Sequence, residues 1–196
     1  DYEMKKKFEL LKSTDLVVNN FLALRQVHVK LDKFDGGTKE VNYTILKKGD
    51  AVCVTLYDKV TDCFMLIRQF CTPAAMNENE HDPWLLQTVA GHIDKGETPE
   101  QAAIRETKEE ADLDCDEVVF MAQGFTSPGI STEIHYHFLA KFDSTKVDVT
   151  KSYGLEDEDI QLVVIPRSEA LGMIQRQEIR NSNAIIGITM ALLHLK

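Results

Sequence analysis

The segment from Gly91 to Leu113, which reads GHIDKGETPEQAAIRETKEEADL, restricts the fold more than any other part of the chain. Thr98 precedes Pro99, and Gln101 follows three residues after the threonine, a pattern typical of a helix start with a capping box. Small or apolar residues, which can pack closely on a sheet, follow at Ala102, Ala103, Ile104, Thr107 and Ala111. The segment therefore predicts a helix that begins near Pro99 and covers a β-sheet.

The predicted helix carries glutamates at positions i, i+3 and i+4, namely Glu106, Glu109 and Glu110, so their carboxylates share one face. Like charges at this spacing destabilise a helix by about 0.2–0.5 kcal/mol per pair. A bound divalent cation would replace that repulsion with coordination. A solvated helix face is the alternative interpretation, and it is the better one for three glutamates taken alone.

At 196 residues the chain is long enough for one domain with a small appendage. Its apolar share of 43% and charged share of 28% are typical of a soluble globular protein. A formal charge of -10 argues against nucleic acid or an anionic membrane as a partner, because both attract basic surfaces. A small phosphorylated ligand is compatible with this charge, since bound Mg²⁺ reverses the local sign.

The longest apolar runs, such as AIIGITMALL, are shorter than the ~20 residues that cross a bilayer. The N-terminal DYEMKKKFELL lacks the apolar core of a signal peptide, so we expect a cytoplasmic protein. The cysteines form no CxxC pair, and we expect reduced thiols at Cys53, Cys63, Cys71 and Cys115.

Runs of β-favouring residues indicate strands before the predicted helix. FLALRQVHVKL and VNYTIL flank a turn signal at Asp35 to Gly37, which predicts a hairpin within residues 16–45. AVCVTLY, CFMLIRQF and WLLQTVA predict further strands, the last ending at Gly91. The C-terminal stretch predicts two helices, one capped by Ser168 and one from about Asn183.

The spacing of seven residues resembles the signature of the Nudix hydrolases, G-x5-E-x7-REUxEExGU, where U is aliphatic. The matching residues are Gly91, Glu97, Arg105, Glu106, Glu109, Glu110 and Leu113. The sequence departs from the signature at Thr107, where an aliphatic residue is expected, and at Asp112, where glycine is expected. Thr107 can pack as valine does, and Asp112 costs mainly the ease with which glycine takes a positive φ at a helix end.

The resemblance implies an α/β protein with the Nudix fold, a mixed β-sheet sandwiched between α-helices, with a small N-terminal antiparallel β subdomain. We expect that subdomain at residues 1–48 and the Nudix hydrolase domain at residues 49–196. The resemblance also implies Mg²⁺ as cofactor, with Mn²⁺ as a substitute. The expected metal-site residues are Glu106, Glu110, Glu109 and the backbone carbonyl of Ala90. Arg105 and Glu97 would form an ion pair that supports them.

Three stretches outside the signature resemble the ADP-ribose pyrophosphatase branch: PWLLQTVAGHIDKGE, TSPGISTE and GLEDEDIQLVVIP. In that branch the SPG turn shapes the sugar-phosphate end of the pocket, which gives Ser127, Pro128, Gly129 and Glu133 a substrate-contact role. A plain Pro-Gly turn without function is the alternative.

The acidic run from 156 to 159 would close on the metal site in this branch. We assign Glu158 to the metal and Glu156 to the catalytic base, with a solvated loop as the alternative. His135 and His137 alternate along the sequence IHYHF, and we expect surface or pocket-wall residues there rather than metal ligands.

Relatives in this branch are homodimers whose N-terminal strands complete the nucleobase pocket. Phe21 falls where an aromatic residue stacks on the base, and Tyr43 and Arg68 are further expected substrate contacts. At Asn42 and Tyr43, where relatives tend to carry arginine, this chain lacks the cation, and at Cys71 a basic residue is also common. The nucleobase therefore stays open.

The predicted function is Mg²⁺-dependent hydrolysis of a nucleoside diphosphate sugar, ADP-ribose first, to AMP and ribose 5-phosphate. A GDP-mannose or UDP-glucose pyrophosphatase is the alternative within the same chemistry. Two non-enzymatic alternatives are a ligand-sensing Nudix domain, which should have lost a metal carboxylate, and an acidic interaction module, which would show no dependence on Mg²⁺.

Overall fold

The computed structural model describes residues 7–19, 22–78, 82–155 and 158–195. The chain forms two compact units. The N-terminal unit comprises Asp1–Gly49 and Phe125–Ile134, and the main unit comprises Asp50–Gly124 and His135–Lys196. Each unit is described by itself below.

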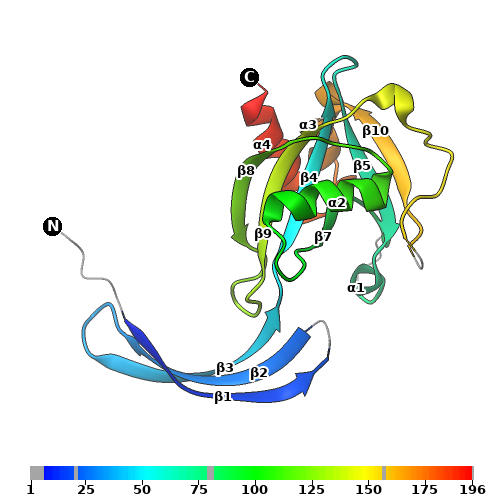
Figure 1. Ribbon diagram of the computed structural model, residues 1–196. Coiled ribbons are helices and arrows are strands. Elements are labelled where there is room, and N and C mark those ends of the chain that lie inside the picture. The colour runs from blue at the N-terminus through cyan, green and yellow to red at the C-terminus, as the bar shows by residue number, and fades with distance from the viewer. Residues whose placement is uncertain (1–6, 20–21, 79–81, 156–157, 196) are drawn as a thin grey trace. The chain divides into compact units, whose positions relative to one another are not determined.

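The N-terminal unit is built on an antiparallel sheet of three strands in the order β1-β2-β3 (Figure 1). The strands are β1 (Phe8–Val18), β2 (Leu22–Asp32) and β3 (Thr38–Lys48). The turn between β2 and β3 contains Gly36 and Gly37 with φ of 94° and 72°, values that favour glycine. The predicted hairpin is therefore confirmed. The prediction missed β1, whose pairing with β2 shifts register twice and so breaks the alternation that marks a strand.

Residues 125–134 join this unit through the end of β3. The Leu46 amide donates to the Ile130 carbonyl at 2.7 Å, and the Thr132 amide donates to the Leu46 carbonyl at 3.0 Å. Leu46 and Ser131 thereby form a parallel bridge. No sequence pattern indicated that these residues pair with the N-terminal strands.

The main unit holds a mixed sheet of seven strands. Five follow the order β10-β5-β4-β9-β8, while β6 pairs with β5 and β7 pairs with β4. β4 runs parallel to β9 and antiparallel to β5 and β7. The strands are β4 (Ala51–Asp58), β5 (Cys63–Phe70), β6 (Trp84–Gln87), β7 (Val89–His92), β8 (Val118–Phe125), β9 (Ile134–Lys141) and β10 (Gln161–Pro166).

Helices cover both faces of this sheet. The helices are α1 (Thr72–Ala75), α2 (Pro99–Ala111), α3 (Arg167–Gln175) and α4 (Ser182–His194), with a short 3-10 helix at Ser144–Lys146. Every residue of β4 is buried, and because successive side chains point to opposite faces, apolar layers lie on both sides of the strand. Figure 1 shows α2 on one face and α3 and α4 on the other. The predicted sandwich of a mixed sheet between helices is confirmed.

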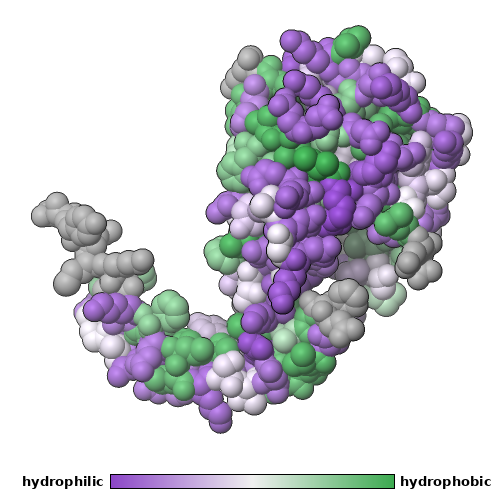
Figure 2. All heavy atoms as spheres, viewed as in Figure 1, coloured by the Kyte–Doolittle hydropathy of each residue, from purple (hydrophilic) through white to green (hydrophobic). Residues whose placement is uncertain are grey.

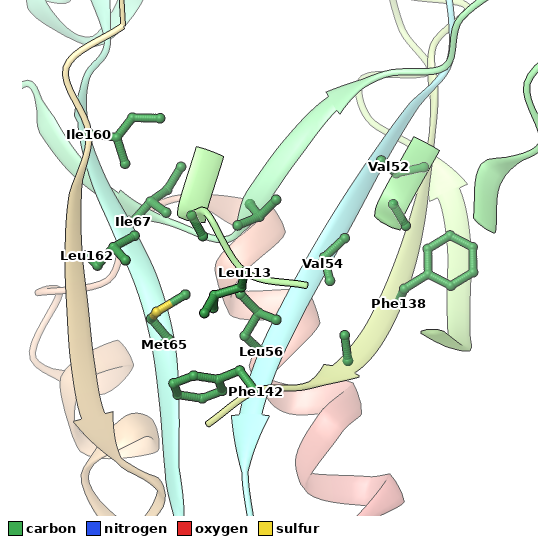
Figure 3. Close-up of a cluster of buried hydrophobic side chains, with 14 of the residues drawn as sticks. Val52, Val54, Leu56, Met65, Ile67, Leu113, Phe138, Phe142, Ile160 and Leu162 are labelled. Atoms are coloured by element: carbon green, nitrogen blue, oxygen red, sulfur yellow. The ribbon is translucent and has the colours of Figure 1, made fainter. Parts of the chain in front are cut away.

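The apolar core has a layer on each face. Under α2, Val52, Val54, Met65, Ile67 and Phe138 pack with the alanines of the helix, as Figure 3 shows for the labelled residues. On the other face, the second layer contains residues of β5, β10, α3 and α4: Phe64, Leu66, Ile165, Ala170, Ala184 and Ile188. None of the described helices is long and apolar enough to span a bilayer.

The start of α2 agrees with the prediction. The Gln101 amide donates to Thr98 Oγ1 at 3.3 Å, and the Thr98 amide donates to Gln101 Oε1 at 2.9 Å, which completes the capping box. At the other end Asp112 takes φ 52°, the left-handed conformation in which the signature has glycine. Lys108 pairs with the Asp112 carboxylate at 2.9 Å. The aspartate therefore replaces glycine without shortening the helix.

The predicted cap of the first C-terminal helix needs correction, whereas the predicted start of the second, near Asn183, is confirmed to within one residue. α3 begins at Arg167 after Pro166, and no side chain caps it, so Ser168 is not the cap. α4 begins at Ser182, because the Asn181 side chain accepts a hydrogen bond from the Ala184 amide at 3.0 Å. Asn181 is thus the cap.

His137 lies in the core, which overturns the expectation of a surface or pocket-wall residue. It is 3% exposed, and its Nδ1 atom has no hydrogen-bond partner within the described part of the chain. Burial, with a smaller contribution from His135, lowers the pKa of His137 to about 4. The alternation of His135 and His137 suggested an exposed face, but helices cover both faces of this sheet.

We predict that His137 makes the protein sensitive to mild acid. Because its folded-state pKa of about 4 lies below the ordinary 6.5, the unfolded chain takes up the proton first, and stability is lost as pH falls through that window. The residue should contribute roughly 3 kcal/mol to that loss. Urea unfolding of His137→Gln between pH 7 and pH 4 should show a shallower decline than the parent, while His194→Gln, at the exposed end of α4, should follow the parent. Equal slopes in His137→Gln and the parent would contradict this prediction.

Candidate active site

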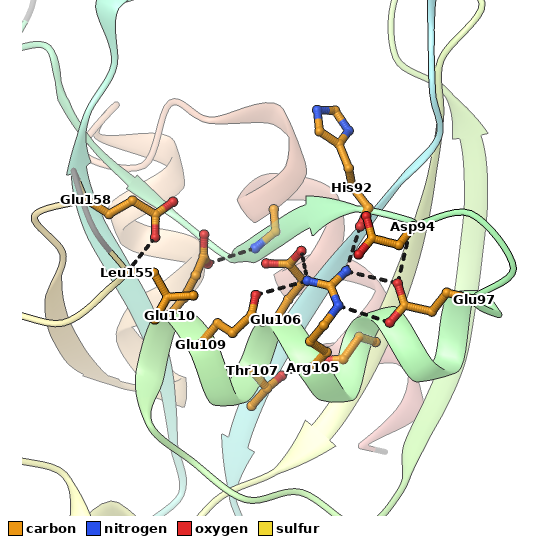
Figure 4. Close-up of polar contacts among 12 residues, drawn as sticks. His92, Asp94, Glu97, Arg105, Glu106, Thr107, Glu109, Glu110, Leu155 and Glu158 are labelled. Carbon is orange, nitrogen blue, oxygen red and sulfur yellow. Dashed lines mark hydrogen bonds and ion pairs between the residues drawn. The ribbon is translucent and has the colours of Figure 1, made fainter. Parts of the chain in front are cut away.

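Glu106, Glu109 and Glu110 of α2 share the face of the helix that lies beside β7 (Figure 4). Glu106 and Glu110 are buried, and Glu109 is partly exposed. The amide of Ala90 on β7 donates to Glu110 Oε2 at 3.0 Å. The Glu110 carboxylate therefore links α2 to β7 next to Gly91, the first residue of the signature.

Gly91 is required by the closeness of β7 to α2. A Cβ atom built on Gly91 would lie 1.9 Å from Glu106 Cδ and 2.0 Å from Glu106 Oε1. Since real Cβ contacts are never this short, any side chain at position 91 would force the Glu106 carboxylate to move. The glycine of the signature thus makes room for a carboxylate.

Arg105 connects the loop after β7 to the helix. Its Nε and Nη2 atoms donate to the two oxygens of Glu97 at 3.0 and 2.9 Å, and Nη2 also donates to the His92 carbonyl at 2.8 Å. Nη1 donates to Glu106 at 2.7 Å and to Glu109 at 3.0 Å. The structure thus brings Arg105 and Glu97 together as expected, and it adds contacts to two further glutamates. The hydrogen bond from Arg105 lowers the pKa of Glu97. The bonds to Glu97, Glu106 and Glu109 in turn raise the pKa of Arg105.

The carboxylates around α2 repel one another. Burial, together with the charges of Glu106, Glu158 and Glu109, raises the pKa of Glu110 to about 8 against the lowering effect of the Ala90 amide. Burial also raises the pKa of Glu106, although Arg105 opposes this. A site with this excess of buried negative charge favours a bound cation.

Glu158 faces α2 from the loop before β10 (Figure 4). Its Oε2 atom accepts a hydrogen bond from the Leu155 amide at 3.1 Å. Gly154 has φ 98°, and a Cβ there would lie 2.6 Å from Glu158 Cβ, so glycine is needed at this turn. Glu156, the expected base, and Phe21, the expected aromatic contact, lie outside the described residues.

The donor set fits a hard divalent cation. Such ions take oxygen ligands, and the site offers the carboxylates of Glu106, Glu109, Glu110 and Glu158 beside the backbone of Ala90. Within the described ranges, no three His, Cys, Asp or Glu side chains already stand as a ligand group. Two of these carboxylates are instead engaged by the Arg105 guanidinium and one by the Ala90 amide.

The expected substrate contacts fall mostly in the N-terminal unit. Ser127, Pro128 and Gly129 form an exposed turn, in which the Ile130 amide donates to the Ser127 carbonyl at 2.9 Å. Tyr43 is exposed on β3. Arg68 is exposed on β5 of the main unit. A cavity of about 390 Å³ lies in the N-terminal unit, lined by Ile45, Phe125, Pro128, Ile130, Ser131 and Thr132.

Glu133 is buried and forms an ion pair with Lys48, whose Nζ atom lies 2.6 Å from Glu133 Oε1. Sequence reasoning missed Lys48, because a lysine at the end of a strand gives no signal of a partner 85 residues away.

A fold of this kind with a carboxylate-lined helix defines a class of metal-dependent hydrolases. The family model of the NUDIX domain matches residues 47–185, so the chain belongs to the Nudix family and is a Nudix hydrolase. The resemblance drawn from the sequence is confirmed.

Named relatives and a solved structure agree with this assignment. The chain is 33% identical to an ADP-ribose pyrophosphatase of Haemophilus influenzae, over 86% of this chain and 78% of that protein. It is 31% identical to a GDP-mannose pyrophosphatase of Yersinia enterocolitica, over 97% of this chain and 98% of that protein. The crystal structure of an ADP compounds hydrolase superposes with a TM-score of 0.72 at 18% identity, covering 96% of this chain and 94% of that one. This last likeness shows the fold.

We predict that Gly91→Ala impairs catalysis while the fold survives, because the added Cβ displaces the Glu106 carboxylate. A displacement of about 1 Å should lower kcat roughly 100-fold. The readout is Mg²⁺-dependent hydrolysis of a nucleotide sugar, with circular dichroism as the test of folding. Gly124→Ala is the matched control, since a Cβ on that β8 glycine meets no atom within 4 Å. Unchanged kcat in Gly91→Ala would show that the position of Glu106 is not critical.

Proposed function

We propose that the protein hydrolyses the diphosphate bond of a nucleoside diphosphate sugar with Mg²⁺ as cofactor. The observation that carries the proposal is the group of mutually repelling carboxylates beside β7, in which the buried Glu106 and Glu110 of α2 are joined by Glu109 and by Glu158 of the loop before β10. ADP-ribose is the first candidate substrate, giving AMP and ribose 5-phosphate, and the ADP-ribose pyrophosphatase of Haemophilus influenzae supports it.

Glu106, Glu110, Glu109, Glu158 and the Ala90 carbonyl would hold the metal. A divalent cation at such a site neutralises charge on the diphosphate and makes a bound water a better nucleophile. Mn²⁺ would serve in place of Mg²⁺, because it also accepts oxygen ligands.

Protein side chains orient these ligands. The pairing of Arg105 with Glu97 fixes the loop after β7 to α2, and the contacts of Arg105 with Glu106 and Glu109 hold both carboxylates on the site face. In this proposal Glu156 accepts the proton of the attacking water. The bond from the Leu155 amide orients the carboxylate of Glu158.

Ser127, Pro128, Gly129 and Glu133 would contact the sugar-phosphate end of the substrate. Phe21, Tyr43 and Arg68 would contact the nucleoside. Exposed polar turns on a fixed scaffold commonly serve such recognition, which supports this division.

We further propose a cytoplasmic homodimer in which residues 1–48 provide dimer contacts and part of the nucleobase pocket. The support is the apolar surface of β1, which exposes Phe8, Leu10, Leu16, Val17 and Val18. Figure 2 shows hydrophobic residues interspersed with hydrophilic ones on the visible face of this sheet.

A GDP-mannose or UDP-glucose pyrophosphatase is the second candidate. It is favoured by the relative from Yersinia enterocolitica, which matches nearly the full length of both chains. Asn42 and Tyr43, at positions where ADP-ribose enzymes tend to carry a cation, also agree with another nucleobase. A ligand-sensing domain has less support, since the carboxylates of the signature are all present.

Chromatographic product analysis distinguishes the candidates. The purified protein is incubated with Mg²⁺ and, separately, with ADP-ribose, GDP-mannose, UDP-glucose and a nucleoside triphosphate. We expect fastest conversion of ADP-ribose to AMP. Faster release of GMP from GDP-mannose would favour the second candidate, and no cleavage of any nucleotide sugar would overturn the proposed function.

Glu110→Gln tests the metal site. The exchange removes one oxygen ligand, and we expect kcat to fall roughly 100-fold or more, the scale of losing one charge-stabilising group. The fold should survive, because the amide fills the same buried space and relieves repulsion from Glu106. Glu100→Gln is the control, an identical change at an exposed site on the same helix. Equal turnover in Glu110→Gln and the parent would remove Glu110 from the site.

A further inference from the structure

The ion pair between Lys48 and Glu133 links the last residue of β3 to the segment that carries the SPG turn. Lys48 Nζ lies 2.6 Å from Glu133 Oε1, and Thr126 Oγ1 donates to Glu133 Oε2 at 3.3 Å. The side chain of Glu133 is 8% exposed, whereas that of Lys48 is 30% exposed. The carboxylate is thus the buried partner, and the ammonium reaches it from the surface.

Other hydrogen bonds, from the backbone and from the Thr132 hydroxyl, hold the two segments together independently of this pair. Thr132 Oγ1 accepts from the Lys48 amide and donates to the Lys48 carbonyl, both at 3.2 Å. The Thr132 amide donates to the Leu46 carbonyl at 3.0 Å. Removing the charge of Lys48 therefore leaves these bonds between the segment and β3 in place, and its direct effect falls on the Glu133 carboxylate.

A buried carboxylate keeps its charge and its direction only while it has a charged or hydrogen-bonding partner. Without the Lys48 ammonium, the Glu133 carboxylate loses a charged partner while its bond from Thr126 Oγ1 remains, and it becomes freer to rotate toward water or to bind a proton. Either change would alter the surface beside the turn of Ser127 to Gly129. Lys48 thereby fixes the direction and the charge of the Glu133 carboxylate beside this turn.

Building on the function proposed above, we propose that Lys48 is a positioning residue that holds the Glu133 carboxylate for the sugar hydroxyls of the substrate. A carboxylate accepts hydrogen bonds from neighbouring hydroxyls, and a fixed carboxylate does so with less loss of entropy than a mobile one. Lys48 therefore acts on substrate affinity through Glu133, without touching the substrate.

The test is a double-mutant cycle of Lys48→Met, Glu133→Gln and the double variant, with kcat, KM and thermal stability measured for the best substrate at saturating Mg²⁺. We expect Lys48→Met to raise KM about tenfold with little change in kcat. This is the result when a mutation weakens an interaction that the substrate makes equally in the ground state and in the transition state. In the Glu133→Gln background the same change should have no further effect on KM, because coupled residues are not additive.

Two variants serve as controls. Lys48→Arg keeps the charge and should restore KM to within about twofold, since the single contact does not depend on the shape of the cation. Lys47→Met makes the same chemical change on the exposed neighbour, whose side chain leaves the opposite face of the sheet, and it should behave as the parent. If Lys48→Met does not fold, Lys48→Gln, which keeps a neutral donor, takes its place in the cycle.

Three results would overturn the inference while the parent remains active. These are a loss of thermal stability without a rise in KM, additive effects of the two substitutions on KM, and an equal rise in KM for Lys47→Met. An inactive parent would instead overturn the proposed function, and the inference with it.

Discussion

The paired hydrogen bonds between Arg105 and Glu97 are the contact on which the arrangement of the site depends. Buried glutamates on one helix face repel each other, and the same guanidinium that binds Glu97 also binds Glu106 and Glu109. One cation thus fastens a loop to a helix and offsets part of the repulsion that would otherwise spread the carboxylates apart. At Gly91 the absence of a side chain leaves room for the Glu106 carboxylate, whose charge Arg105 partly compensates.

Local features of the fold could be predicted from the sequence because they depend on neighbours in the chain. The capping box at Thr98 and the left-handed end at Asp112 involve residues within one turn of helix. Pairing between distant segments escaped prediction. β1 alternates imperfectly because of its bulges. The attachment of residues 125–134 to β3 depends on backbone bonds, which any side chain permits, and on the hydroxyl of Thr132.

The same distinction between features set by chain neighbours and features set by distant segments applies to the site. The glutamates of α2 share a face because of helical periodicity alone, so their grouping was predictable from spacing. The bond from Arg105 to the His92 carbonyl, the burial of His137 and the partner of Glu133 depend on how separate elements pack, and spacing carries no information about that. The roles of individual residues toward metal and substrate stay predictions, and they rest on chemistry rather than on position in the fold.

The division of the chain into units has a consequence for protein engineering. The polypeptide enters the N-terminal unit a second time between β8 and β9, as residues 125–134. A chimera that exchanged only residues 1–49 with those of a relative would join a foreign β3 to the native SPG turn. Recombination that keeps β3 and its partner segment from the same parent therefore requires two crossovers in the middle of the chain as well as one near Gly49, so the N-terminal sheet is not a transferable module.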